Sequence, residues 1–77
     1  MMYTDAMRKA FRSIRPPQNF QVEIVDNENF LVVRADEQAF TKLGHDDKIE
    51  AAQYMIKVKK ALEENGAIVL LTRKAIK

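Results

Sequence analysis

The apolar positions of the first fifteen residues repeat at helical spacing. The i, i+3, i+4 pattern predicts an amphipathic helix over residues 4–15 whose apolar face is made by Tyr3, Ala6, Met7, Ala10, Phe11 and Ile14. Thr4 is the expected N-cap, and Asp5 falls in the first turn. Pro16 and Pro17 end the helix, because proline cannot continue one.

The next apolar pattern has a period of two and predicts a β-hairpin. Phe20, Val22 and Ile24 alternate with polar residues, as in a strand with one buried face. Residues 26–29, DNEN, have the chemistry of a turn. The return strand over residues 30–35 is apolar at nearly every position, which is typical of a strand buried on both faces.

The longest periodic segment predicts a helix over residues 46–65. One narrow stripe contains Ala51, Met55, Val58 and Leu62, and a second, smaller apolar ridge contains Ile49, Ala52 and Ile56. Asn65 and Gly66 form the expected C-cap, and residues 67–73 read as a third strand.

Residues 36–44 fit either a short helix or a packed loop. In the helical alternative, which we favour, Asp36 caps the helix, Gly44 stops it, and Ala39, Phe40 and Leu43 point inward.

These elements predict one α+β domain over residues 1–77. Its order is α-β-β-(short α)-α-β, with a three-stranded, mainly antiparallel sheet and two main helices. If Val22, Ile24, Leu31 and Val33 face the helices, then Val25, Phe30, Val32 and one of Val69 or Leu71 face away. Either the helices divide between the two faces, or one face is an apolar patch of the kind that marks an interface. The residues we expect at such an interface are Val25, Phe30, Val32, Ile49, Ala52 and Ile56.

The amino-acid composition excludes several kinds of functional site. The 77 residues include no cysteine and one histidine, which excludes disulfides, thiolate zinc sites and imidazole-rich metal sites within one chain. The chain has no long apolar run that could span a membrane, so we expect a cytoplasmic protein without membrane attachment. No residue pattern identifies a cofactor, a small-molecule substrate or a catalytic nucleophile, and we expect no enzymatic activity.

The stretch LGHDDKIEA, residues 43–51, is the best candidate for a site. A glycine before a helix is where phosphates bind, and His45, Asp46 and Asp47 are possible metal ligands. However, the two carboxylates would repel a phosphate, and consecutive helical residues point about 100° apart and so do not converge on one ion. His45 as a general base would need an orienting acid that the sequence does not supply. We therefore expect Asp46 or Asp47 to cap the helix.

Residues 43–71 and the order of elements resemble the bacterial type of K homology domain. That resemblance implies a nucleic-acid-binding loop of the form G-x-x-G between the central helices. Here the loop would be Gly44-His45-Asp46-Asp47, which lacks the second glycine and is acidic. The resemblance therefore implies weak binding at most.

Charge is segregated along the chain, although the net charge is only +2. Residues 1–20 and 51–77 carry net charges of +3 and +4, and residues 21–50 carry −5. The first helix gathers Arg8, Lys9, Arg12 and Arg15, which could contact phosphates, lie weakly on an anionic membrane, or form a solvated face. Our leading hypothesis is a self-associating interaction module, a homodimer, with weak electrostatic nucleic-acid binding as the alternative.

Overall fold

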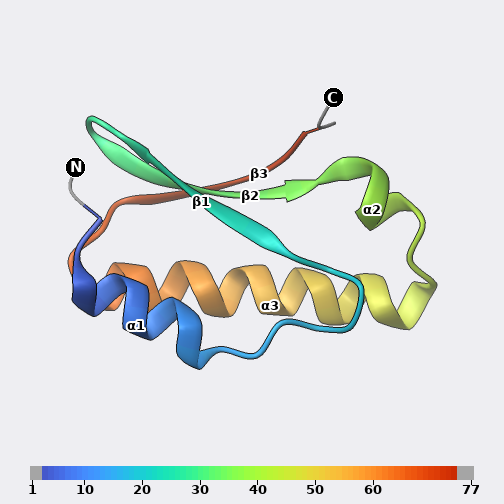
Figure 1. Ribbon diagram of the computed structural model, residues 1–77. Coiled ribbons are helices and arrows are strands. Elements are labelled where there is room, and N and C mark those ends of the chain that lie inside the picture. The colour runs from blue at the N-terminus through green and yellow to red at the C-terminus, as the bar shows by residue number, and fades with distance from the viewer. Residues whose placement is uncertain (1–2, 75–77) are drawn as a thin grey trace.

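The computed structural model describes residues 3–74 and consists of a three-stranded sheet with its two longer helices on one side (Figure 1). The elements run α1 (Asp5–Ser13), β1 (Val22–Asn27), β2 (Phe30–Asp36), α2 (Glu37–Thr41), α3 (His45–Glu64) and β3 (Val69–Lys74). This order confirms the predicted α+β fold. None of the helices within residues 3–74 is long and apolar enough to cross a lipid bilayer.

The sheet is mixed, with strand order β1-β2-β3. β1 and β2 form the predicted antiparallel hairpin, whereas β3 pairs with β2 in parallel. The reason lies in the connection: α3 carries the chain back under the sheet, so that β3 starts again at the end where β2 starts (Figure 1). The expectation of a mainly antiparallel sheet is therefore corrected to one antiparallel and one parallel pair.

The core lies between the sheet and α3. Leu31, Val33 and Ala35 of β2 are completely buried against the helices, whereas the residues between them are half-buried on the other face. The α3 stripe predicted from the sequence supplies the opposite wall with Ala51, Met55, Val58 and Leu62. Both α1 and α3 lie on this side, so the helices do not divide between the two faces of the sheet (Figure 1).

The ends of α1 and α3 are set by local chemistry. The Thr4 hydroxyl caps α1 as predicted, accepting a hydrogen bond from the Met7 backbone N–H at 3.1 Å. The helix ends at Ser13 instead of residue 15, and Ile14 is already extended. At the other end of the chain, Gly66 has φ +95 and closes α3 as predicted.

Phe20 does not belong to a strand, contrary to the hairpin prediction. It follows Asn19, whose φ of 62 is left-handed, and its side chain turns into the core ahead of β1. There the Phe20 ring meets Phe40 and Tyr54 edge-on, with ring centroids 6.2 and 6.3 Å away. The connection between α1 and β1 is thus anchored by one buried aromatic ring.

Candidate interaction surface around β3

The outer edge of β3 is open. Within residues 3–74, β3 pairs with β2 only, and no strand lies on its other side. The Ile68 carbonyl accepts a hydrogen bond from the Leu31 N–H at 2.8 Å, so the backbone groups of Ile68 face β2. Because backbone groups alternate along a strand, those of Val69, Leu71 and Arg73 point to the open edge. An edge of this kind is a template for pairing with another strand.

The exposed apolar side chains gather on β3 and the adjacent flank of α3. Within residues 3–74, the exposed large apolar residues are Ile49 (47%), Ile56 (57%), Ile68 (62%), Leu70 (50%) and Leu71 (38%). By the register, Leu71 lies on the helix side of the sheet and Leu70 on the opposite side, which we call the uncovered face because neither long helix of residues 3–74 lies on it. Apolar surface therefore flanks the open edge on both of its faces.

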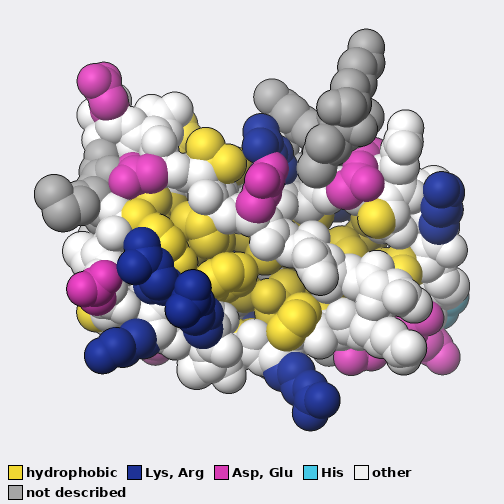
Figure 2. Space-filling view, viewed as in Figure 1, with side chains coloured by type: hydrophobic (Ala, Val, Ile, Leu, Met, Phe, Trp, Pro, Cys, Tyr) yellow, Lys and Arg dark blue, Asp and Glu magenta, His cyan; other side chains and the backbone are white. Residues whose placement is uncertain are grey.

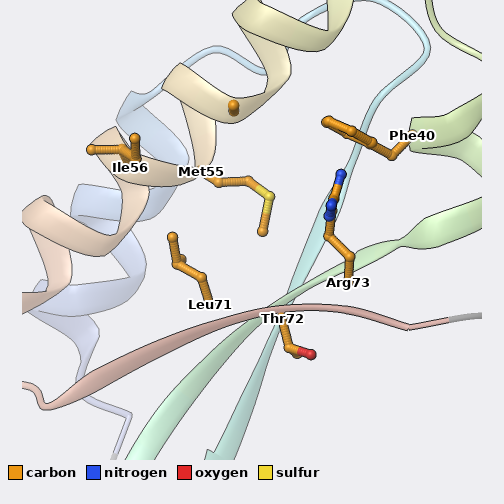
Figure 3. A pocket seen from close by; sticks show the side chains of 7 residues that line it. Phe40, Met55, Ile56, Leu71, Thr72 and Arg73 are labelled. Carbon is orange, nitrogen blue, oxygen red and sulfur yellow. The ribbon is translucent and has the colours of Figure 1, made fainter.

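A groove of about 350 Å³ runs between α3 and β3. Figure 3 shows Leu71 reaching from β3 towards Met55 and Ile56 of α3, with Arg73 and Phe40 at the other end. The Arg73 guanidinium lies 4.0 Å from the centre of the Phe40 ring, a cation–π contact. Ala52 contributes the smallest side chain of the lining.

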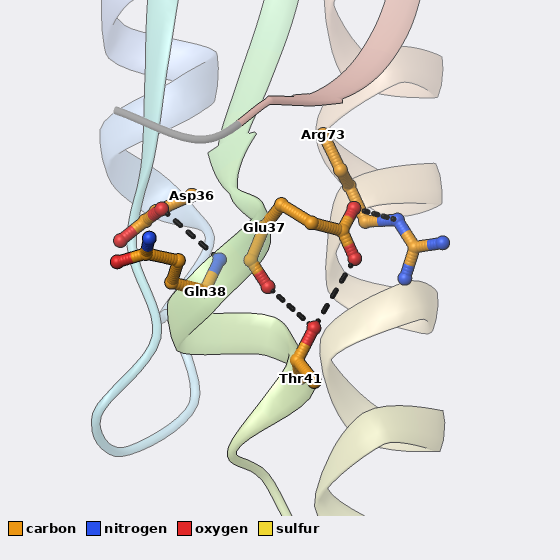
Figure 4. A network of polar contacts seen from close by, with 5 residues as sticks. All are labelled: Asp36, Glu37, Gln38, Thr41 and Arg73. Atoms are coloured by element: carbon orange, nitrogen blue, oxygen red, sulfur yellow. Dashed lines mark hydrogen bonds and ion pairs between the residues drawn. The ribbon is translucent and has the colours of Figure 1, made fainter. Parts of the chain in front are cut away.

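Arg73 is held by acidic and aromatic neighbours. Its Nε lies 3.4 Å from a carboxylate oxygen of Glu37, the first residue of α2 (Figure 4). The Thr41 hydroxyl donates to the Glu37 backbone carbonyl at 2.8 Å, which fixes the same turn. Asp36 caps α2 as predicted, accepting from the Gln38 N–H at 3.1 Å. Arg73 therefore ties β3 to α2 through one ion pair and one cation–π contact.

The predicted interface residues fall on two separate surfaces. Ile49, Ala52 and Ile56 lie on the flank of α3 beside the groove. Val25, Phe30 and Val32 lie on the uncovered face of the sheet, where each is half-buried.

The residues of β3 itself were not among those predictions. Val69 and Leu71 both lie on the helix side, so the expectation that one of them faces away is wrong, and Leu70 faces away instead. The register of β3 against β2 decides this, and the sequence of β3 alone does not fix it. The sequence did show that Ile68, Leu70 and Thr72 alternate with Val69, Leu71 and Arg73 and so share one face of the strand.

The basic residues of the N-terminal segment form a patch of their own. Figure 2 shows Lys and Arg side chains gathered over α1. Arg8, Lys9 and Arg12 are on α1, whereas Arg15 lies beyond its end and lines a hollow with Glu50 and Lys57 of α3. Arg8 is partly engaged, since it pairs with Asp5 at 3.3 Å and lies over the Tyr3 ring. Burial raises the pKa of Tyr3, against the lowering by Arg8 and Arg12.

A second hollow, of about 250 Å³, lies between α1 and β1. Its apolar lining includes Phe11, Ile14 and Val22, with the Arg12 side chain beside them. Figure 2 shows apolar side chains along this side of the molecule, next to the basic patch. Tyr54 closes the hollow from α3, and burial raises the pKa of its phenol.

The segment from Gly44 to Asp47 is the start of α3 and not a loop. Gly44 is the N-cap residue, has extended backbone and offers no side-chain cap, so the expectation that Asp46 or Asp47 caps the helix is wrong. Both aspartates lie in the first turn, where they still interact favourably with the helix dipole. His45 is exposed. Among residues 3–74, no three His, Asp or Glu side chains are grouped so that they could hold a metal ion.

The position corresponding to a K homology loop is therefore helical from His45 onward. No family model, curated protein or solved structure matches the chain.

Proposed function

We propose that the protein is a non-enzymatic interaction module that associates with a second copy of itself. The observation that carries this proposal is the gathering of exposed apolar side chains around one open strand edge. Within residues 3–74, the five exposed large apolar side chains belong to β3, to Ile68 just before it, or to the adjacent flank of α3. Contiguous apolar surface on a small protein marks a site of association.

The size of the chain supports the same proposal. A domain of 77 residues buries a small core, and such domains commonly gain stability from disulfides, metals or a partner subunit. Because the chain contains no cysteine, its composition favours a partner subunit as the source of this added stability. A two-fold homodimer is the commonest closed arrangement of this kind.

Light scattering coupled to size exclusion tests self-association directly. We expect a mass of twice 8.9 kDa at tens of micromolar protein, with a shift towards the monomer on dilution. Ile56→Lys, which puts a charge into the exposed apolar surface, should shift the equilibrium to the monomer. Gln53→Lys adds the same charge at a polar exposed position of α3 and should leave the mass unchanged. A monomeric mass at every concentration would contradict the proposal.

Weak nucleic-acid binding is a second candidate function, favoured by the basic patch over α1 (Figure 2). The exposed side chains of Lys9, Arg12 and Arg15 supply positive charge without an aromatic platform or a glycine loop. Binding of this kind is electrostatic, with a Kd of about 10⁻⁴–10⁻⁶ M at physiological salt. Anisotropy of a labelled single-stranded oligonucleotide should show this range, and Arg12→Gln should weaken it. Sub-micromolar affinity with sequence preference would mean a specific site that this patch does not explain.

A further inference from the structure

We infer that two copies of the chain join through their β3 strands, paired antiparallel across a two-fold axis into one six-stranded sheet. This arrangement rests on the proposed self-association and specifies its surface. A two-fold axis perpendicular to the sheet brings the same edge of each copy together with the strands antiparallel. The outward-facing backbone groups of Val69, Leu71 and Arg73 then pair with those of the second copy.

The first four residues of β3, Val69–Thr72, lack the features by which proteins protect an edge strand. Residues 67–71 are uninterrupted by charge or proline, and Arg73 is the first charged residue of the strand. The other edge of the sheet differs. β1 carries Glu23 and Asp26, and the backbone N–H of Tyr3 donates to the Asp26 carboxylate at 2.9 Å, which places Tyr3 beside the helix side of that strand. Of the two edges of the sheet, the β3 edge therefore has fewer charged side chains and more exposed apolar side chains for a second copy to contact.

The position of α3 fits the same axis. Of the three strands, β3 is the one on which α3 packs most closely, and α3 also contacts β2. Strands lie about 4.8 Å apart, so a helix above the space between β2 and β3 lies about 5 Å from an axis at the β3 edge. Two such helices lie about 10 Å apart, the usual separation of packed helices. In this dimer the ridge of Ile49, Ala52 and Ile56 packs against the same ridge of the second copy, and the small Ala52 side chain lets the two helices approach closely.

The uneven charge along α3 favours a second copy as the occupant. Residues 46–50 carry Asp46, Asp47 and Glu50 against Lys48, whereas residues 57–64 carry three lysines against Glu63 and Glu64, with Lys59 already paired to Glu63 at 2.8 Å. Two α3 helices related by this axis run antiparallel, so the net negative start of each comes nearer the net positive stretch of the other. Antiparallel helix dipoles add to the attraction. A parallel arrangement would instead set like charges beside each other.

The uncovered face of the sheet is the competing surface. There Val25, Val32 and Leu70 form an apolar row across the three strands. The adjacent row contains the Glu23–Arg34 ion pair and Thr72, which would be desolvated if two such faces stacked. Val25 and Val32 are also half-buried already, so each has less apolar surface left to cover than Leu70 of the same row.

Crosslinking of single cysteines distinguishes the two surfaces, because the natural chain contains none. Ala52→Cys places a thiol on the α3 ridge, close to the proposed axis. Val32→Cys places one at the centre of the uncovered face, and in the edge-paired dimer the two β2 strands are about 14 Å apart. Ser13→Cys on α1 is exposed and remote from both surfaces, and gives the background. Circular dichroism checks that each variant is folded before a short bismaleimide is added.

We expect efficient dimer formation by Ala52→Cys, with Val32→Cys at the background of Ser13→Cys. Two results, in protein whose mass by light scattering is that of a dimer, would overturn the β3 arrangement but leave self-association standing. One is crosslinking through Val32→Cys, and the other is crosslinking of Ala52→Cys that does not exceed the background. Protein that scatters as a monomer at all concentrations would overturn both.

Discussion

Phe20 offers the strongest test of how the core is assembled. Its side chain is 2% exposed and contacts two rings edge-on, although it lies in the connection between α1 and β1. Truncation of a buried phenylalanine to alanine costs about 3–5 kcal/mol. A 77-residue domain has a total stability of about 4–12 kcal/mol, so Phe20→Ala should remove a large part of it.

The two ring contacts can be separated from burial by Phe20→Leu. Leucine keeps most of the apolar bulk but loses both edge-to-face contacts, each worth about 0.5–1.5 kcal/mol. We therefore expect Phe20→Leu to cost about 1–3 kcal/mol, between the wild type and Phe20→Ala. Phe30→Leu is the matched control: Phe30 is half-buried on the uncovered face, and its replacement should cost about 0.5 kcal/mol.

Urea unfolding followed by circular dichroism measures these differences. The protein concentration must be the same for every variant, since self-association raises the apparent stability. With a slope of about 1 kcal/mol per molar urea, a loss of 3 kcal/mol moves the midpoint by about 3 M. A cost below about 1 kcal/mol for Phe20→Ala would refute the anchoring role of Phe20. Equal costs for Phe20→Leu and Phe20→Ala would instead assign the whole effect to the rings.

Three further predictions concern single sites. Thr4→Ala removes the side-chain cap of α1 and should cost about 0.5–2 kcal/mol in the same urea assay, whereas Thr4→Ser, which keeps the hydroxyl, should cost much less. Gly66→Ala should cost about 1–2 kcal/mol, because Gly66 has φ +95 although no atom would clash with the added Cβ; Gly44→Ala, at ordinary φ, should cost less, and equal losses would argue against strain at Gly66. Burial raises the pKa of Tyr54, so the neutral phenol stabilises the folded state; this stability is complete below pH 10, the ordinary pKa, and is lost as the pH rises through the folded-state pKa. Thermal melts between pH 8 and 12 should therefore fall more steeply for the wild type than for Tyr54→Phe, and parallel curves would exclude a contribution from Tyr54.

Local patterns in the sequence determined the elements and much of the core. The period of 3.6 in α1 and α3, the period of two from Val22 onward in the hairpin, and the signals at Thr4, Asp36 and Gly66 were found where they were predicted, whereas Phe20 lies outside the strand. The α3 stripe of Ala51, Met55, Val58 and Leu62 is buried as expected. These features follow from the sequence because capping, turn formation and amphipathic periodicity depend on residues a few positions apart.

Tertiary structure alone decided how these elements meet. The parallel pairing of β3, its register against β2 and the placement of both long helices under one face depend on contacts between residues distant in the chain. The same contacts left Ile68, Leu70 and Leu71 exposed, which the apolar composition of the strand did not indicate. At the start of α3, local signals also gave the wrong residue: two aspartates suited to an N-cap are the second and third residues of the helix, because the helix already begins after Gly44. A strand pattern specifies which side chains alternate, but the neighbouring strand and the covering helix decide which of the two sets is buried.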